Sequence, residues 1–209
     1  MRLYSGYGWS TIAGAILFVI AVLFHPILVN PWDTEVALES IEHSRHWIWD
    51  HALFMIALSM WILGLSGVES LYKNVTISVR NAGRLLISSL AVWMVVLALE
   101  IGILPYLVSY MQVHSDIFIV AESLFTFGLL AAYLAMAFIW LAVILFSHAK
   151  IQENHTMDWS DVLWYLSGVI ALLSTILLLI FPKLAFWFLA GMAPAFIWTI
   201  LSGWKMIKT

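Results

Sequence analysis

The sequence predicts an all-α integral membrane protein with six transmembrane helices in one bundle and both chain ends on the cytoplasmic side. Of its 209 residues, 64% are hydrophobic and only 10% are charged, whereas about a quarter of the residues are charged in an ordinary soluble domain. A soluble chain of this size keeps much of its surface in water and cannot hide so many apolar side chains. The composition therefore excludes a soluble globular enzyme and a disordered tail.

Six apolar runs are long enough to cross a bilayer, which takes about 20 residues in a helix. They cover residues 9–29, 47–71, 85–111, 117–146, 162–181 and 184–207. The runs do not alternate between apolar and polar residues, so they are not barrel strands. In lipid the backbone must form its own hydrogen bonds, and helices do this within one segment. We expect one domain over residues 1–209, with the first four helices around a polar site and the last two packed outside them.

The basic residues are distributed unevenly between the two sides of the predicted bundle. One side holds Arg2, Lys73, Arg80, Arg84, Lys150, Lys205 and Lys208, and the other holds only Arg45 and Lys183. Cytoplasmic loops carry the excess of Lys and Arg in membrane proteins. The sequence therefore predicts a multi-pass protein of the plasma (cell inner) membrane with both termini in the cytoplasm. The first outer loop, residues 30–46, is acidic and suits an interfacial turn of helix, and Asp158 suits the cap of the fifth span.

Four ionisable residues lie inside the predicted spans, where placing a charge is costly and usually functional. They are His25, His51, Glu100 and Glu122, each on a different helix. At a rise of about 1.5 Å per residue, all four fall in the outer quarter to third of the bilayer. The sequence therefore predicts one His/carboxylate site in the outer half of the membrane.

Metal or haem binding is the first interpretation of this site. The chain has no cysteine, so any metal ion must use imidazole or oxygen ligands. We expect His25 and His51 to bind haem b or a divalent metal ion, with Glu100 and Glu122 as further ligands or as catalytic proton carriers. His46 and His114 lie just above this layer and are alternate ligands. This interpretation predicts electron transfer or oxidoreductase chemistry, with a quinone or another lipophilic small molecule as a partner.

Two other classes of function remain open. Glu100 and Glu122 are also suited to acid–base catalysis on a lipophilic substrate without a cofactor, as in a lipid isomerase-type enzyme. The chain is also suited to a structural or assembly subunit, in a homo-oligomer or a larger membrane complex, in which the same residues only pair with neighbours. In every case membrane lipid is a partner. Nucleic acid is not, because the net charge is −3 with 9 basic and 12 acidic residues.

Overall fold

The computed structural model describes residues 2–25, 32–111, 113–154 and 158–209, and all the regular structure in these ranges is helical. Six helical stretches are long and apolar enough to cross a membrane, which confirms the predicted number of spans. They are Tyr4–Phe24, Trp47–Leu71, Ile77–Met111, Phe118–Glu153, Trp159–Ile180 and Phe186–Lys208. The predicted residues 26–29 of the first span lie outside the described residues.

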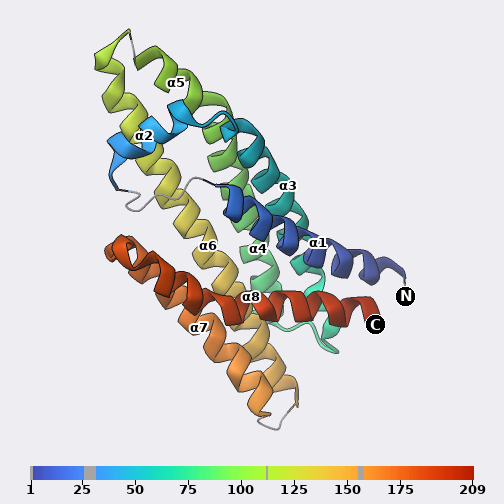
Figure 1. Ribbon diagram of the computed structural model, residues 1–209. Helices are drawn as coiled ribbons and strands as arrows, with labels where there is room; N and C mark the ends of the chain where they lie inside the picture. The colour runs from blue at the N-terminus through green and yellow to red at the C-terminus, as the bar shows by residue number, and fades with distance from the viewer. Residues whose placement is uncertain (1, 26–31, 112, 155–157) are drawn as a thin grey trace.

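Short helices interrupt or join the long ones (Figure 1). The order is α1 (Arg2–Phe24), α2 (Thr34–His43), α3 (Trp47–Ser66), η1 (Gly67–Leu71), α4 (Ile77–Ala98), η2 (Leu99–Ile103), α5 (Leu104–Met111), η3 (Ser115–Ile117), α6 (Phe118–Asn154), α7 (Trp159–Ile180), η4 (Pro182–Leu184) and α8 (Ala185–Lys208). The α4, η2 and α5 segments follow one another without a break and together form the third span.

Two helix starts show how side chains cap the backbone. Asp158 accepts a hydrogen bond from the Ser160 amide (3.1 Å) at the start of α7, as the sequence predicts. Helix α4 starts at Ile77, eight residues before the predicted span, because the Thr76 hydroxyl oxygen accepts from the Val79 amide (3.4 Å). The extra two turns carry charged and polar residues, which a search for apolar runs leaves out.

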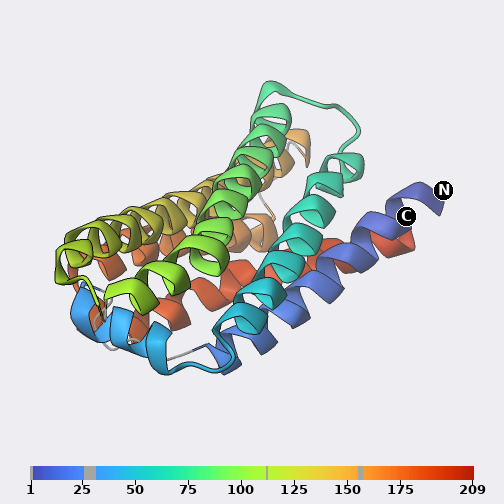
Figure 2. The same ribbon diagram turned by 90° about the horizontal axis from the view of Figure 1, so that it is seen from above.

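The six spans form a closed ring of neighbours (Figures 1 and 2). Helix α1 packs on α3, α3 on α4, α4 on α6, α6 on α7, α7 on α8, and α8 packs back on α1. The last two spans thus complete the ring between α6 and α1. The sequence predicts instead that these two helices pack outside the first four. The two chain ends lie close together at one end of the bundle (Figure 2).

Helices α1 and α3 approach each other closely because glycines replace larger side chains where they meet. A Cβ added at Gly14 would collide with the backbone of Trp61, and one added at Gly64 would collide with the backbone of Thr11. The Ser10 hydroxyl donates to the Met60 carbonyl across the same contact (2.8 Å). Small residues allow this kind of backbone approach between membrane helices, and the contact fixes the position of α1 against α3.

We expect Gly14→Ala to destabilise the bundle, because its methyl group would meet the α3 backbone, which cannot move aside like a flexible side chain. Overpacking of this kind costs about 1–3 kcal/mol in the free energy of unfolding. The control is Gly83→Ala on α4, where an added Cβ meets nothing within 4 Å. Thermal unfolding in detergent measures both variants, and equal melting temperatures would contradict the close contact.

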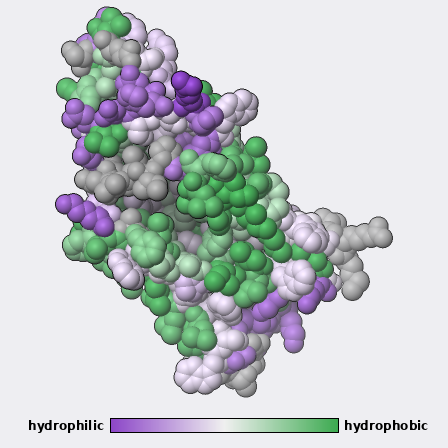
Figure 3. All heavy atoms as spheres, in the orientation of Figure 1, coloured by the Kyte–Doolittle hydropathy of each residue, from purple (hydrophilic) through white to green (hydrophobic). Residues whose placement is uncertain are grey.

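Helix α2 lies across the end of the bundle that is opposite to the chain termini (Figure 1). Its buried residues Ala37, Leu38 and Ile41 pack in a second hydrophobic cluster with residues of α5 and α6. The sequence predicts an interfacial turn of helix here, and the structure has a helix of 10 residues. The surface agrees with this placement, since hydrophobic residues cover the middle of the face in Figure 3 and hydrophilic residues gather toward the two ends.

Candidate functional site

Three segments of the chain meet near the α2 end of the bundle and bring four ionisable side chains together. His25 follows the last residue of α1, Asp50 and His51 lie in the first two turns of α3, and Glu100 lies in η2. One ligand atom each from His25, Asp50 and His51 lie within 4.8 Å of one another, and Glu100 contacts His51. We call these four residues the histidine–carboxylate cluster.

His51 is the central residue of the cluster and is only 1% exposed. Its Nδ1 atom lies 2.8 Å from the Trp47 carbonyl oxygen. A carbonyl oxygen only accepts, so Nδ1 carries the hydrogen and the lone pair of the neutral ring is on Nε2. The Trp47 indole stacks on the ring, with centroids 4.0 Å apart. The imidazole is therefore held in one tautomer and one orientation.

The Nε2 atom of His51 lies 3.3 Å from Oε2 of Glu100. A lone pair of neutral imidazole and an ionised carboxylate are both acceptors, and two acceptors at this distance repel each other. The contact becomes favourable when a proton or a metal ion is held by the two atoms. This contact is therefore suited to either of the two chemistries that the sequence leaves open, metal binding and acid–base catalysis.

Asp50 is the member of the cluster that sequence reasoning missed as a ligand. The residue is 6% exposed, and neither carboxylate oxygen has a hydrogen-bond partner among the described residues. Its Oδ2 atom is 4.0 Å from His51 Nδ1. Burying a carboxylate without hydrogen bonds costs several kcal/mol, and such a group needs a specific reason. A cation beside Asp50 would provide that reason.

His25 completes the cluster from α1 and is half-buried. Its ring lies 5.2 Å from the His51 ring and 5.5 Å from the Phe54 ring, measured between centroids. The Trp47 ring is 5.9 Å away. Aromatic side chains thus surround the two imidazoles, and they lower the local polarity, which strengthens any electrostatic interaction inside the cluster.

Glu100 lies in a π-helical turn that ends just before Pro105. The Leu104 amide bonds to the Leu99 carbonyl, five residues back. In the same pattern the amide of residue 105 would donate a hydrogen bond to the Glu100 carbonyl, but residue 105 is proline and has no N–H. The Trp47 indole Nε1 donates to that carbonyl instead (2.8 Å). Trp47 therefore links α3 to η2, and π-helical turns of this kind are frequent at functional sites.

We expect Trp47→Phe to destabilise the protein by about 1–3 kcal/mol, because the Glu100 carbonyl would lose its only donor side chain in the described structure. The ring stacking on His51 would be preserved. Thermal unfolding in detergent measures the loss, with Trp49→Phe as the control, since Trp49 is 77% exposed on the same helix. An unchanged melting temperature for Trp47→Phe would show that the hydrogen bond contributes nothing.

The other residues that the sequence nominated lie outside this cluster. Glu122 on α6 accepts a hydrogen bond from the Thr34 hydroxyl (2.8 Å) and so fastens α2 to α6. His46 is the exposed N-cap residue of α3. His114 is exposed and stacks on Tyr110, with centroids 4.4 Å apart. Their roles as ligands or proton carriers stay predictions.

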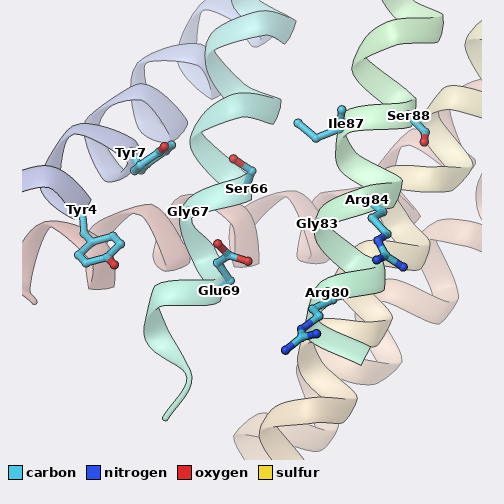
Figure 4. Close-up of a pocket in the computed structure, with 10 residues that line it drawn as sticks. All are labelled: Tyr4, Tyr7, Ser66, Gly67, Glu69, Arg80, Gly83, Arg84, Ile87 and Ser88. Carbon is cyan, nitrogen blue, oxygen red and sulfur yellow. The ribbon is translucent and has the colours of Figure 1, made fainter. Parts of the chain in front are cut away.

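Two cavities lie at the opposite end of the bundle, near the chain termini. The larger, about 930 Å³, opens between α1, the end of α3 and α4. Figure 4 shows Tyr4 and Tyr7 on one side of it and Arg80 and Arg84 on the other, with Glu69 between them. The smaller, about 430 Å³, lies between η1, α6, α7 and α8. Neither cavity is lined by a residue of the histidine–carboxylate cluster.

Comparison of the chain with protein-family models, with curated proteins and with solved structures gives no match. The six long apolar helices define the class, a multi-pass helical membrane protein. Its distinguishing feature is a group of two histidines and a buried aspartate that is able to hold a metal ion. What the protein does has to be inferred from the chemistry of those residues.

Proposed function

We propose that this chain is a membrane metalloprotein that binds one divalent transition-metal ion at His25, Asp50 and His51, with Glu100 as a fourth ligand. The observation that carries the proposal is the buried carboxylate of Asp50, whose two oxygens have no hydrogen-bond partner among the described residues and which lies beside two imidazoles. A bound cation accounts for this arrangement.

The donor set suits zinc, iron or copper better than magnesium or calcium. Imidazole nitrogen is a ligand that first-row transition metals prefer, whereas magnesium and calcium take oxygen ligands. Two neutral imidazoles and two carboxylates would also balance the charge of a divalent ion. His51 supports the proposal further, because metal-binding histidines usually donate their other ring N–H to a backbone carbonyl or a carboxylate, as His51 does to Trp47.

The distances within the cluster leave room for an ion. In a tetrahedral zinc site the ligand atoms are about 3.3 Å apart, given metal–ligand bonds of about 2.0–2.1 Å. The ligand atoms of His25, Asp50 and His51 lie within 4.8 Å of one another. Side-chain rotations that shorten these separations by up to about 1.5 Å would complete the coordination.

Haem b, the other cofactor that the sequence predicts, suits the cluster less well. A haem iron with two axial histidines has the porphyrin plane between the two imidazoles. The rings of His25 and His51 are in mutual contact, with centroids 5.2 Å apart, and Trp47 covers one face of His51. A macrocycle would have to displace these contacts, so we propose an ion in place of haem.

A bound transition-metal ion would supply electron transfer or Lewis-acid chemistry. The side chains around it would supply the rest. Glu100 would complete the ligand set next to His51, and the aromatic rings of Trp47 and Phe54 would limit access of water to the imidazoles. A lipophilic partner such as a quinone would reach the cluster from the surrounding lipid without leaving the membrane.

The test is elemental analysis of the detergent-purified protein, combined with absorption spectra of oxidised and reduced samples. We expect about one equivalent of zinc, iron or copper per chain, the stoichiometry of a single closed site, and no Soret band. Which metal is found decides between redox and Lewis-acid chemistry. A protein that contains no metal, and takes up none after incubation with these ions, would rule out the metal centre.

Acid–base chemistry is the second candidate, and the 3.3 Å contact between His51 Nε2 and Glu100 Oε2 favours it. A proton held by these two atoms would serve the same electrostatic purpose as a metal ion. In this case the metal-free protein is the active form, and Glu100→Gln should remove turnover of a lipophilic substrate without changing the fold. Metal analysis separates the two candidates before any substrate is known.

A further inference from the structure

The smaller of the two cavities at the terminal end is built from four elements that carry both basic and aromatic side chains. Its lining includes Tyr72, Ser147, Trp164, Trp198, Lys205 and Lys208. Its volume of about 430 Å³ falls in the range of small-molecule sites. It is separate from the histidine–carboxylate cluster, and the proposed metal centre does not use it.

The basic side chains of this cavity are only partly neutralised. Lys150 pairs with Glu153 at 2.6 Å. No described carboxylate forms an ion pair with Lys205 or Lys208, and the Lys208 ammonium lies 4.9 Å from the centre of the Trp204 ring. Two lysines of α8 and one carboxylate, Asp161, thus line the cavity beside the Lys150–Glu153 pair. Basic side chains remain in excess, so an anionic group is the fitting occupant.

Ser147 gives an independent indication of a ligand in the wall of the cavity. The residue is 3% exposed, and its hydroxyl has no hydrogen-bond partner among the described residues. Serine hydroxyls in helices normally bond to a carbonyl three or four residues back, as Ser167 does with Trp164 (2.7 Å). Ser147 makes no such bond, so its donor is available to an acceptor oxygen inside the cavity.

The Tyr72 hydroxyl is not available as a donor to a ligand in the cavity. Its hydroxyl donates to the Phe146 carbonyl at 2.7 Å. Burial, together with the nearby charges of Glu153 and Asp161, raises the pKa of the Tyr72 phenol. The phenol therefore remains protonated and remains the donor to Phe146, while its ring forms part of the wall. Among the polar lining residues, Ser147 and the two lysines of α8 are the groups suited to bind an anion.

We propose that this cavity binds the phosphate group of an anionic membrane lipid, with Lys205 and Lys208 at the phosphate and Ser147 donating to one of its oxygens. The cavity lies where the spans end, which is the depth of the lipid headgroups. Its apolar and aromatic wall, including Trp164 and Trp198, suits the glycerol and acyl part of a lipid better than a soluble anion. Basic pockets between transmembrane helices are known to bind anionic headgroups.

The larger cavity, shown in Figure 4, provides the matched control. It also contains basic residues, Arg80 and Arg84, at the same end of the bundle. It is wide, its arginines are exposed, and Glu69 lies between its two sides. If binding depended only on positive charge at this end, removing Arg80 would weaken it as much as removing Lys205.

The experiment is native mass spectrometry of the delipidated full chain in detergent, titrated with phosphatidylglycerol and with phosphatidylcholine of the same acyl chains. We expect a single phosphatidylglycerol to bind about 25-fold more tightly than phosphatidylcholine, given a factor of about five for each of the two lysines that attract an anionic headgroup. Lys205→Gln and Ser147→Ala should each weaken phosphatidylglycerol about fivefold, the factor expected for one basic residue or one hydrogen bond. Arg80→Gln should leave the affinity unchanged. Thermal unfolding checks that the variants are folded.

Three results would overturn the proposal. Equal affinity for the two lipids would show that the cavity does not recognise an anionic headgroup. An equal loss in Arg80→Gln and Lys205→Gln would show attraction by charge alone. Binding of glycerol 3-phosphate as tightly as phosphatidylglycerol would assign the cavity to a soluble phosphate compound instead of a lipid.

Discussion

His51→Phe is expected to remove the metal ion from the purified protein while leaving the helical bundle folded. Phenylalanine keeps the aromatic stacking on Trp47, whose ring centroid is 4.0 Å from that of His51, but it has no nitrogen ligand. Loss of a group that only supports a metal ligand costs about 10–100-fold in affinity, so loss of the central ligand should exceed about a hundredfold. Elemental analysis after detergent purification measures the metal content.

The controls for His51→Phe are the two histidines that the sequence nominates as alternate ligands. His46→Ala and His114→Ala change exposed residues outside the cluster, and both variants should retain the metal. Circular dichroism and the melting temperature show whether each variant is folded. A His51→Phe protein that is folded and keeps a full equivalent of metal would contradict the assignment of His51.

The second large effect is that replacing Asp50 should stabilise the protein without metal and destabilise it relative to wild type with metal. Asp50→Leu is expected to stabilise the metal-free protein by about 1–4 kcal/mol, because an apolar side chain replaces a buried carboxylate that has no hydrogen-bond partner among the described residues. The wild-type protein should gain about 2.7 kcal/mol from metal present at 100 times its Kd, and the variant should gain nothing. Thermal unfolding with a chelator and with added metal gives all four values.

Asp116→Leu is the control for Asp50→Leu, since Asp116 is exposed at the same end of the bundle. It should change neither the stability of the metal-free protein nor the gain from metal. If a metal ion binds beside Asp50, the order of stability of wild type and Asp50→Leu reverses between the chelator and the added metal. If Asp50→Leu is less stable than wild type with the chelator present, then Asp50 is satisfied without a metal.

The spans and part of the site were predictable from the sequence for simple reasons. Length and apolarity determine which segments can cross a bilayer, so the six runs correspond to six helices. Helical rise alone puts His25, His51 and Glu100 at one depth, and the structure brings these three side chains together. The same argument placed Glu122 in the layer, but depth carries no information on direction, and Glu122 bonds to Thr34 of α2.

Other features depend on contacts between distant parts of the chain. Asp50 looks like a surface residue near a helix start, and its burial results from the packing of the neighbouring helices around it. Pro105 signals that a backbone acceptor near Glu100 lacks a donor, but it does not reveal that an indole from α3 supplies one. Helix α2 is too short and too polar for a search for apolar spans, and its position depends on a cluster shared with α5 and α6.

A cobalt(II) titration of the metal-free protein, followed by visible absorption, tests the metal centre most directly. Cobalt occupies the same kinds of nitrogen and oxygen site as zinc and iron, and its visible bands report coordination by protein ligands. We expect bands that increase to an end point at about one cobalt per chain, and that are absent in His51→Phe. A titration without an end point, or with the same bands in His51→Phe, would contradict a metal centre at the histidine–carboxylate cluster.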